Sequence, residues 1–145
     1  MKKIFIFFIL FFSSFEEDRL YAQSSNSIIV IGNKIGFEST SMKELKQIFR
    51  GKYSNWKNNE QVTIVLPSPK SESAVKVAFT LYNTSVSSMQ RYWLSLVFQG
   101  RFSAPVFLET DLEIIAYVKK TPGAIGAISI DAVGVPKNLI INIAN

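Results

Sequence analysis

The chain of 145 residues contains neither cysteine nor histidine. The absence of cysteine excludes disulfides, thiolate metal sites, a cysteine nucleophile and a lipid-modified N-terminal cysteine. The absence of histidine removes the usual general base near neutral pH and the commonest zinc ligand. No Walker-type phosphate loop, dinucleotide fingerprint or EF-hand loop is present. We therefore expect a protein that is not an enzyme and that has no cofactor or metal.

The apolar residues are concentrated at the N-terminus, where two lysines precede the stretch Ile4–Phe15. This stretch is shorter than the roughly 20 residues that span a bilayer, and it is typical of a secretory signal peptide. We predict a signal peptide over residues 1–22 and a domain over residues 23–145. The domain is expected in the periplasm, without a lipid anchor and without a membrane span after cleavage. The charged residues 16–19 are unusual before a cleavage site, which leaves an uncleaved N-terminal anchor as the alternative.

The net charge is +5, from 16 Lys and Arg against 11 Asp and Glu. Residues 1–22 carry three basic and three acidic side chains, so residues 23–145 keep the full +5. A basic secreted domain can attract small anions, polyanions or a membrane surface. The charges are scattered, however, so a solubilising surface is the simpler interpretation. Nucleic acid is not an expected partner, because no basic-aromatic motif is present.

Strands and helices are predicted to alternate along residues 28–143. Apolar runs indicate strands at Ile28–Ile31, Val62–Leu66, Ala124–Ile130 and Leu139–Ile143, with an extended piece at Pro105–Leu108. Capping-box patterns precede three helices, at Ser41–Glu44, Ser87–Gln90 and Thr110–Glu113. A further helix opens at Ser71 or Ser73, with Val75, Phe79 and either Leu81 or Tyr82 as its apolar stripe. This order predicts one α/β domain with a mixed, mostly parallel sheet flanked by helices.

The segment Lys70-Ser71-Glu72-Ser73 is the main candidate for a binding site. It follows a predicted strand and opens a helix, whose first N–H groups and partial positive charge favour anions. The hydroxyls of Ser71 and Ser73 add donors, and Lys70 adds a full charge. The alternative is an ordinary helix N-cap, which needs a Ser for structural reasons alone.

Other candidates have equally simple structural explanations. Two glycines in 121–126 allow close approach of a ligand, or only a helix stop and tight packing. Trp56 stands in a polar loop and is the aromatic residue most suggestive of an exposed sugar or protein surface. Glu109, Asp111 and Glu113 form an acidic cluster that could serve glycoside chemistry. They lie at a helix start, however, where acids stabilise the helix dipole.

Several motifs in one order resemble the phosphate ABC transporter substrate-binding proteins. The first is Met42–Lys52, with the pattern L-x-x-I-F-x-G-K, followed by Trp56. A Ser-bearing helix start with Phe79 comes next, and Pro122–Gly126 closes the series with P-G-A-I-G. Between them stand Tyr92-Trp93, Phe98-Gln99-Gly100 and Pro105. The resemblance covers residues 28 to 130 and is closest to short members of the family.

The resemblance implies a single lobe with the type II periplasmic-binding-protein fold, phosphate or another small anion as ligand, and an ABC permease as partner. Three departures imply weak or altered binding. Family members have two lobes that close around phosphate, whereas residues 23–145 correspond to about one lobe. The family's Gly-rich N-terminal phosphate motif has no counterpart here. In its second phosphate loop, aligned on Phe79, only Ser73 matches; Pro69 replaces an Arg, a bidentate phosphate donor, and Glu72 replaces a Gly. The alternative function is a lobe that no longer binds ligand and recruits an envelope protein.

Overall fold

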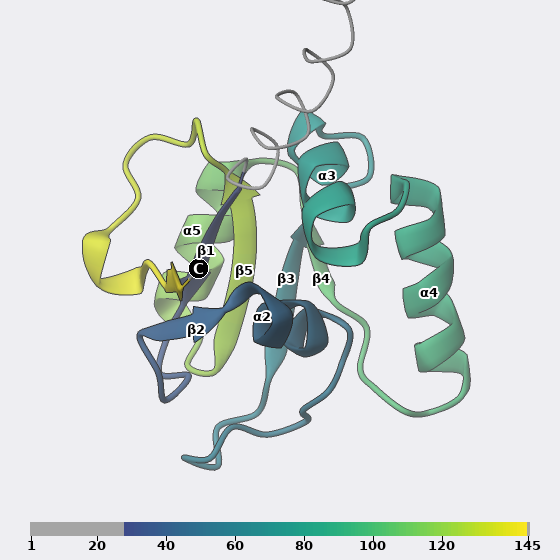
Figure 1. Cartoon of the computed structure of the whole chain (residues 1–145), viewed down its shortest axis with the longest axis horizontal. Coiled ribbons are helices and arrows are strands. Elements are labelled where there is room, and N and C mark those ends of the chain that lie inside the picture. Colours follow the sequence, from purple (N-terminus) through teal and green to yellow (C-terminus); the bar gives the residue numbers. More distant parts are fainter. Residues whose placement is uncertain (1–27, 145) are drawn as a thin grey trace, which may run out of the picture.

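The computed structural model describes residues 28–144, so the predicted signal peptide lies outside the described residues. Its main element is a four-stranded sheet with the order β1-β5-β3-β4 (Figure 1). Strand β3 pairs in parallel with β4 and β5, and β1 pairs antiparallel with β5. The strands span Ile28–Gly32 (β1), Thr63–Pro67 (β3), Val106–Leu108 (β4) and Ala124–Ser129 (β5). The prediction of a mixed, mostly parallel sheet is confirmed.

A smaller parallel sheet joins the C-terminal end of the described chain to the segment that follows β1. Strand β2, Ser39–Ser41, pairs with β6, Asn142–Ala144. The strand predicted at Leu139–Ile143 lies further along the chain, as β6, because the 3₁₀ helix η3, Lys137–Leu139, occupies the predicted start.

The helices begin at side-chain caps. Helix α2 is Met42–Phe49, α3 is Glu72–Val77 and continues as the π-helix η2, Ala78–Tyr82; α4 is Val86–Phe98 and α5 is Asp111–Lys120. Thr110 forms the predicted reciprocal capping box with Glu113. The prediction of a cap at Ser87 is wrong, because Ser85 caps α4 by accepting from the N–H of Ser88. Within residues 28–144, no helix is long and apolar enough to cross a membrane.

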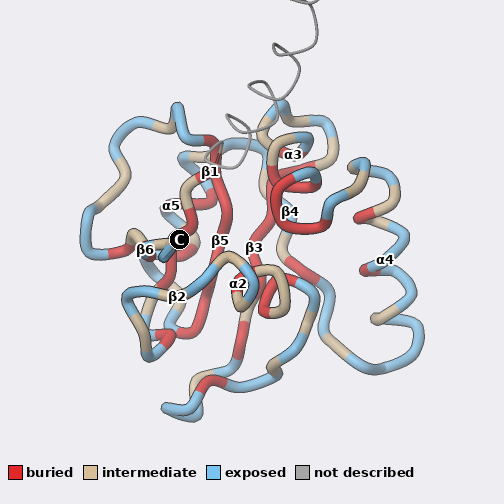
Figure 2. Tube along the Cα trace, viewed as in Figure 1, coloured by how far each residue is buried: buried red, intermediate tan, exposed pale blue. Residues whose placement is uncertain are grey.

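Both faces of the four-stranded sheet are covered, as expected for parallel strands (Figure 1). Side chains alternate along β3: Ile64 and Leu66 join the core that includes residues of α2, η2 and α4, whereas Val65 joins the core under α5. Strand β5 is buried along its whole length (Figure 2). Helix α4 is covered least and buries only Met89 and Trp93.

The predicted apolar stripe of the helix after Ser71 is partly wrong. Val75 is 62% exposed and Phe79 is 44% exposed, whereas Val77 and Leu81 are buried. The buried positions 74, 77, 78 and 81 have the spacing of one helix face. Val75 and Phe79, four residues apart, therefore share the opposite, exposed face, although the helix changes from α to π bonding at Ala78.

Trp56 belongs to the core, so the interpretation of an exposed aromatic surface is wrong. Its side chain is 6% exposed, and its indole Nε1–H donates to the carbonyl oxygen of Gly123 at 2.8 Å. Gly123 has φ +83°, and a Cβ there would collide with the carbonyl oxygen of Gln61. Both a left-handed backbone and a close approach therefore require glycine at the entry to β5.

We expect Gly123→Ala to lower the free energy of unfolding by about 1–3 kcal/mol more than Gly134→Ala, because it adds a steric collision to the backbone strain. Gly134 is the matched control, since it has φ +73° and nothing within 4 Å of the added Cβ. Denaturant unfolding monitored by Trp fluorescence measures both variants. Equal losses would show that the close approach at Gly123 is unimportant.

A buried hydroxyl joins α2, η2 and α4. Tyr82 Oη donates to the carbonyl oxygen of Phe49 at 2.6 Å and accepts from the indole N–H of Trp93 at 2.9 Å. Burial raises the pKa of Tyr82 well above its usual range, so the hydroxyl keeps its proton at all ordinary pH values. The pair of bonds fixes how α4 sits against the core.

Tyr82→Phe should therefore lower the free energy of unfolding by about 1–3 kcal/mol, because it leaves buried groups unpaired. Tyr92→Phe is the control: this hydroxyl also donates to a carbonyl, that of Arg50, but at an exposed position. Urea unfolding of the two variants gives the comparison. A loss in Tyr82→Phe no larger than in Tyr92→Phe would contradict the assigned role.

Candidate functional site

The candidate site lies where the three parallel strands end. Strands β3, β4 and β5 share one direction, so their carboxyl ends meet at one edge of the sheet, and α3 and α5 begin there (Figure 1). Ligands of open α/β sheets bind outside the carboxyl ends of the strands. The predicted residues Lys70, Ser71 and Ser73 all belong to the connection from β3 into α3.

The two serines have different roles at this edge. Ser71 is the N-cap, and its Oγ accepts from the backbone N–H of Ala74 at 3.3 Å. Ser73 Oγ instead donates to Asp111 Oδ1 at 3.0 Å, which connects α3 with the first residue of α5. Lys70 is exposed and makes no hydrogen bond or ion pair with the other described residues.

Asp111 is the centre of the arrangement. Its second oxygen, Oδ2, accepts from the backbone N–H of Ser129, the last residue of β5, at 3.3 Å. One half-buried carboxylate thus receives donors from α3 and from the sheet edge. Sequence reasoning placed Asp111 in an acidic cluster at a helix start and did not connect it with Ser73.

Lys76 completes the group, which we name the Asp111 cluster: Ser73, Lys76, Asp111, Ser129 and Asp131. Lys76 Nζ donates to Ser129 Oγ at 3.1 Å and to Asp131 Oδ2 at 3.0 Å. The sequence indicates this contact only through the spacing of Ser73 and Lys76, because residues three apart on a helix lie on the same face. Lys76 stands three residues after Ser73, and it reaches the sheet edge that Lys70 does not contact.

The donors of the Asp111 cluster are suited to an oxyanion, and in this structure they bind the carboxylate of Asp111 itself. A hydroxyl and a backbone N–H converge on carboxylate oxygens, and an ammonium group stands one hydrogen bond away. Carboxylate and phosphate oxygens accept such donors in the same way. The two carboxylates outnumber the single lysine, so a second anion meets repulsion here. No group of three carboxylates among residues 28–144 is placed to hold a metal ion.

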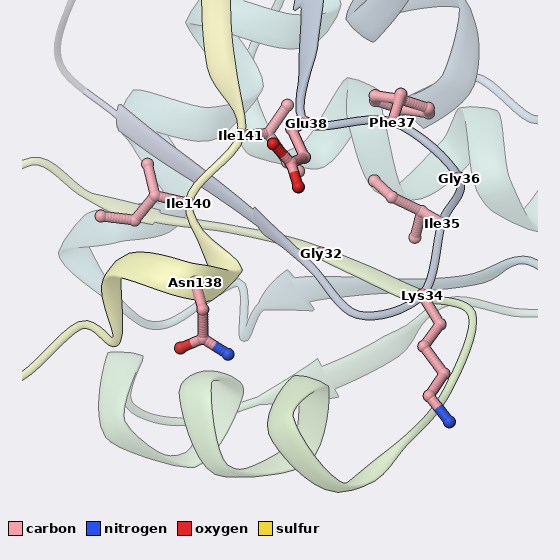
Figure 3. A pocket seen from close by; sticks show the side chains of 9 residues that line it. All are labelled: Gly32, Lys34, Ile35, Gly36, Phe37, Glu38, Asn138, Ile140 and Ile141. Carbon is pink, nitrogen blue, oxygen red and sulfur yellow. The ribbon is translucent and has the colours of Figure 1, made fainter.

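A hollow of about 450 Å³ lies elsewhere in the fold, lined by Lys34, Glu38, Asn138 and neighbouring residues (Figure 3). Gly32 in its wall pairs with Ile125, at the start of β5, whereas Ser129 is at the strand's other end. The hollow is therefore at the opposite edge of the sheet from the Asp111 cluster. The amine of Lys34 points away from the carboxylate of Glu38, so its polar groups do not converge (Figure 3).

Solved structures with a similar fold are phosphate-transport proteins. PstS from Borrelia burgdorferi aligns with a TM-score of 0.55 and 18% identity, over 82% of this chain and 47% of that one. A putative phosphate ABC transporter substrate-binding protein with bound phosphate, from Clostridium perfringens, aligns with a TM-score of 0.55 and 18% identity, over 81% and 44%. No protein-family model matches the chain, and no curated protein matches it significantly.

These comparisons establish the fold class. The chain has the mixed α/β fold of periplasmic substrate-binding proteins and spans less than half the length of these two structures. The expected periplasmic-binding-protein-like fold is therefore confirmed. At 18% identity the likeness carries the fold alone, and the site rests on the residues of this chain.

Asp111→Ala should lower the free energy of unfolding by about 1–3 kcal/mol, because it strips the acceptor from Ser73 and from the N–H of Ser129. Asp131→Ala should cost about 1 kcal/mol or less, since its ion pair with Lys76 is exposed. Chemical denaturation of both variants makes the comparison. If Asp131→Ala proves as costly as Asp111→Ala, the carboxylate of Asp111 does not hold this edge together.

Proposed function

We propose that the protein is a non-enzymatic, solute-binding-like protein of the periplasm that takes phosphate or another small anion weakly at the Asp111 cluster. Ser73 and Lys70 are proposed ligand-binding residues, and Ser71 holds the helix start that presents them. Export by a signal peptide and delivery to an ABC permease belong to the same proposal. The fold of the solved phosphate-transport proteins, one of which holds phosphate, supports this class of ligand.

One observation carries the proposal. The hydroxyl of Ser73 and the N–H of Ser129 already point at carboxylate oxygens, those of Asp111. Donors arranged around one oxyanion are arranged for another of similar size. In the unliganded protein the carboxylate of Asp111 occupies these donors. An incoming anion therefore has to displace this carboxylate and is also repelled by its negative charge.

Charge around the cluster explains why we propose weak binding. Asp111 and Asp131 lie in it and Glu72 stands beside Ser73, against Lys76 and the exposed Lys70. We therefore expect a dissociation constant in the millimolar range, about 4 kcal/mol of binding free energy. The overall charge of +5 favours the approach of anions from solution.

The test is calorimetric titration with inorganic phosphate, with sulfate for comparison. Asp111→Ala should bind phosphate about tenfold or more tightly than the unchanged protein, because it frees two donors and removes a like charge within a few ångströms. Glu38→Ala makes the same charge change at the opposite edge and should bind as the unchanged protein does.

Two further variants locate the anion. Adding Ser73→Ala and Lys70→Ala to Asp111→Ala should abolish most of the gain. If Asp111→Ala binds no more tightly than Glu38→Ala, or if the triple variant keeps the gain, phosphate does not bind at this edge and the proposal is wrong.

Exposed apolar side chains beside the cluster favour a second candidate function, that of an envelope interaction module. Leu112 is 65% exposed next to Asp111, Ile130 is 47% exposed next to Ser129, and Val133 is 77% exposed. Exposed apolar side chains grouped on a surface can mark a site of protein contact. A photo-crosslinking residue at position 130 should then form a defined adduct in cells, and a protein that stays monomeric and gives no adduct counts against this function.

A further inference from the structure

A second hollow, of about 260 Å³, shares no residue with the Asp111 cluster. It lies where α2 and α4 both end: Arg50 is the C-cap of α2, and Arg101 follows the C-cap of α4, Gln99. We name it the two-arginine pocket. Its lining residues are Arg50, Gly51, Tyr92, Leu96, Arg101 and Phe102.

Among residues 28–144, neither guanidinium group has a carboxylate partner. No Asp or Glu lines the pocket, and the ion pairs within residues 28–144 involve Lys52 and Lys76 but neither arginine. Arg50 Nη2 donates to the carbonyl oxygen of Tyr82 at 3.1 Å, which holds this guanidinium in place while its other N–H groups stay available. Two arginines without a carboxylate partner in the wall of one pocket favour an oxyanion, which guanidinium groups can bind through several N–H groups.

The rest of the wall is apolar and packed. Phe102 packs against Trp93 with ring centroids 5.5 Å apart and the two rings tilted by 60°. It also lies against Gly51, where an added Cβ would be 3.3 Å from its ring. Tyr92 Oη donates to the carbonyl oxygen of Arg50 at 2.6 Å, so the tyrosine side chain is held against the backbone of Arg50. The wall of the pocket therefore combines two arginines with aromatic and aliphatic side chains.

Helix capping explains only part of this arrangement. Cations are favourable at helix C-termini, which accounts for one arginine near the end of each helix. That preference does not require both arginines to line one hollow, nor two aromatic residues to line it with them. It also leaves the pocket without any acidic residue in a chain that carries 11 of them.

We propose that the two-arginine pocket binds a small oxyanion attached to a flat apolar group, such as an aryl phosphate or an aryl carboxylate. Arg50 and Arg101 bind the anionic oxygens, and Tyr92, Leu96 and Phe102 contact the apolar group. This site is separate from the one proposed for phosphate, and it prefers a ligand with an apolar part over inorganic phosphate.

The test is an amide NMR titration of the protein with phenyl phosphate, with inorganic phosphate and phenol as partial ligands. Phenyl phosphate should give saturable shifts at Gly51, Leu96, Arg101 and Phe102, and each partial ligand should bind at least about tenfold more weakly. Arg101→Ala should weaken phenyl phosphate about tenfold, since it removes one of two charged contacts.

Arg91→Ala is the matched control, because Arg91 is an exposed arginine of α4 outside the pocket. It should change the affinity less than about twofold, as should Ser73→Ala, which alters only the Asp111 cluster. Equal weakening by Arg91→Ala and Arg101→Ala would show attraction to a diffuse basic surface and overturn the proposal. Shifts confined to the Asp111 cluster, or none at millimolar ligand, would overturn it too.

Discussion

Strand β5 is the constraint on which the rest of the structure depends. It is buried throughout and pairs with β1 on one side and β3 on the other. Gly123 receives the indole of Trp56 at its entry, and a Cβ at Gly126 would be 3.0 Å from Ile114 of α5. A strand held this closely fixes the position of its last residue, Ser129, whose N–H meets Asp111.

The same strand and its parallel neighbours bring together the residues of the proposed site. Because β3, β4 and β5 are parallel, the starts of α3 and α5 meet at one edge, and Ser73 and Asp111 come together although they stand far apart in sequence. The donors there converge on an oxyanion that belongs to the protein itself. The weak binding that we propose follows from this arrangement, because the protein's own carboxylate occupies the donors that an anion would use.

Local patterns in the sequence predicted the fold well. The strands at Ile28, Val62 and Ala124 begin within one residue of their predicted positions, and the capping box at Thr110 is present. Failures arose where tertiary contacts decide. The core takes the helix face of Val77 and Leu81 and leaves Phe79 exposed, and the contact with Gly123 buries Trp56 in a loop that looks polar.

Only those residues of the candidate site that belong to one helix start could be predicted from the sequence. Ser71 and Ser73 follow from the helix start, but the partners Asp111 and Ser129 depend on how the strands pair, which residue spacing does not encode. The most direct test of the central claim is an amide NMR titration of Asp111→Ala and the unchanged protein with inorganic phosphate. The account predicts shifts at Ser73, Ala74 and Ser129 that saturate at lower phosphate in Asp111→Ala. Equal shifts in the two proteins, or none at these amides, would contradict it.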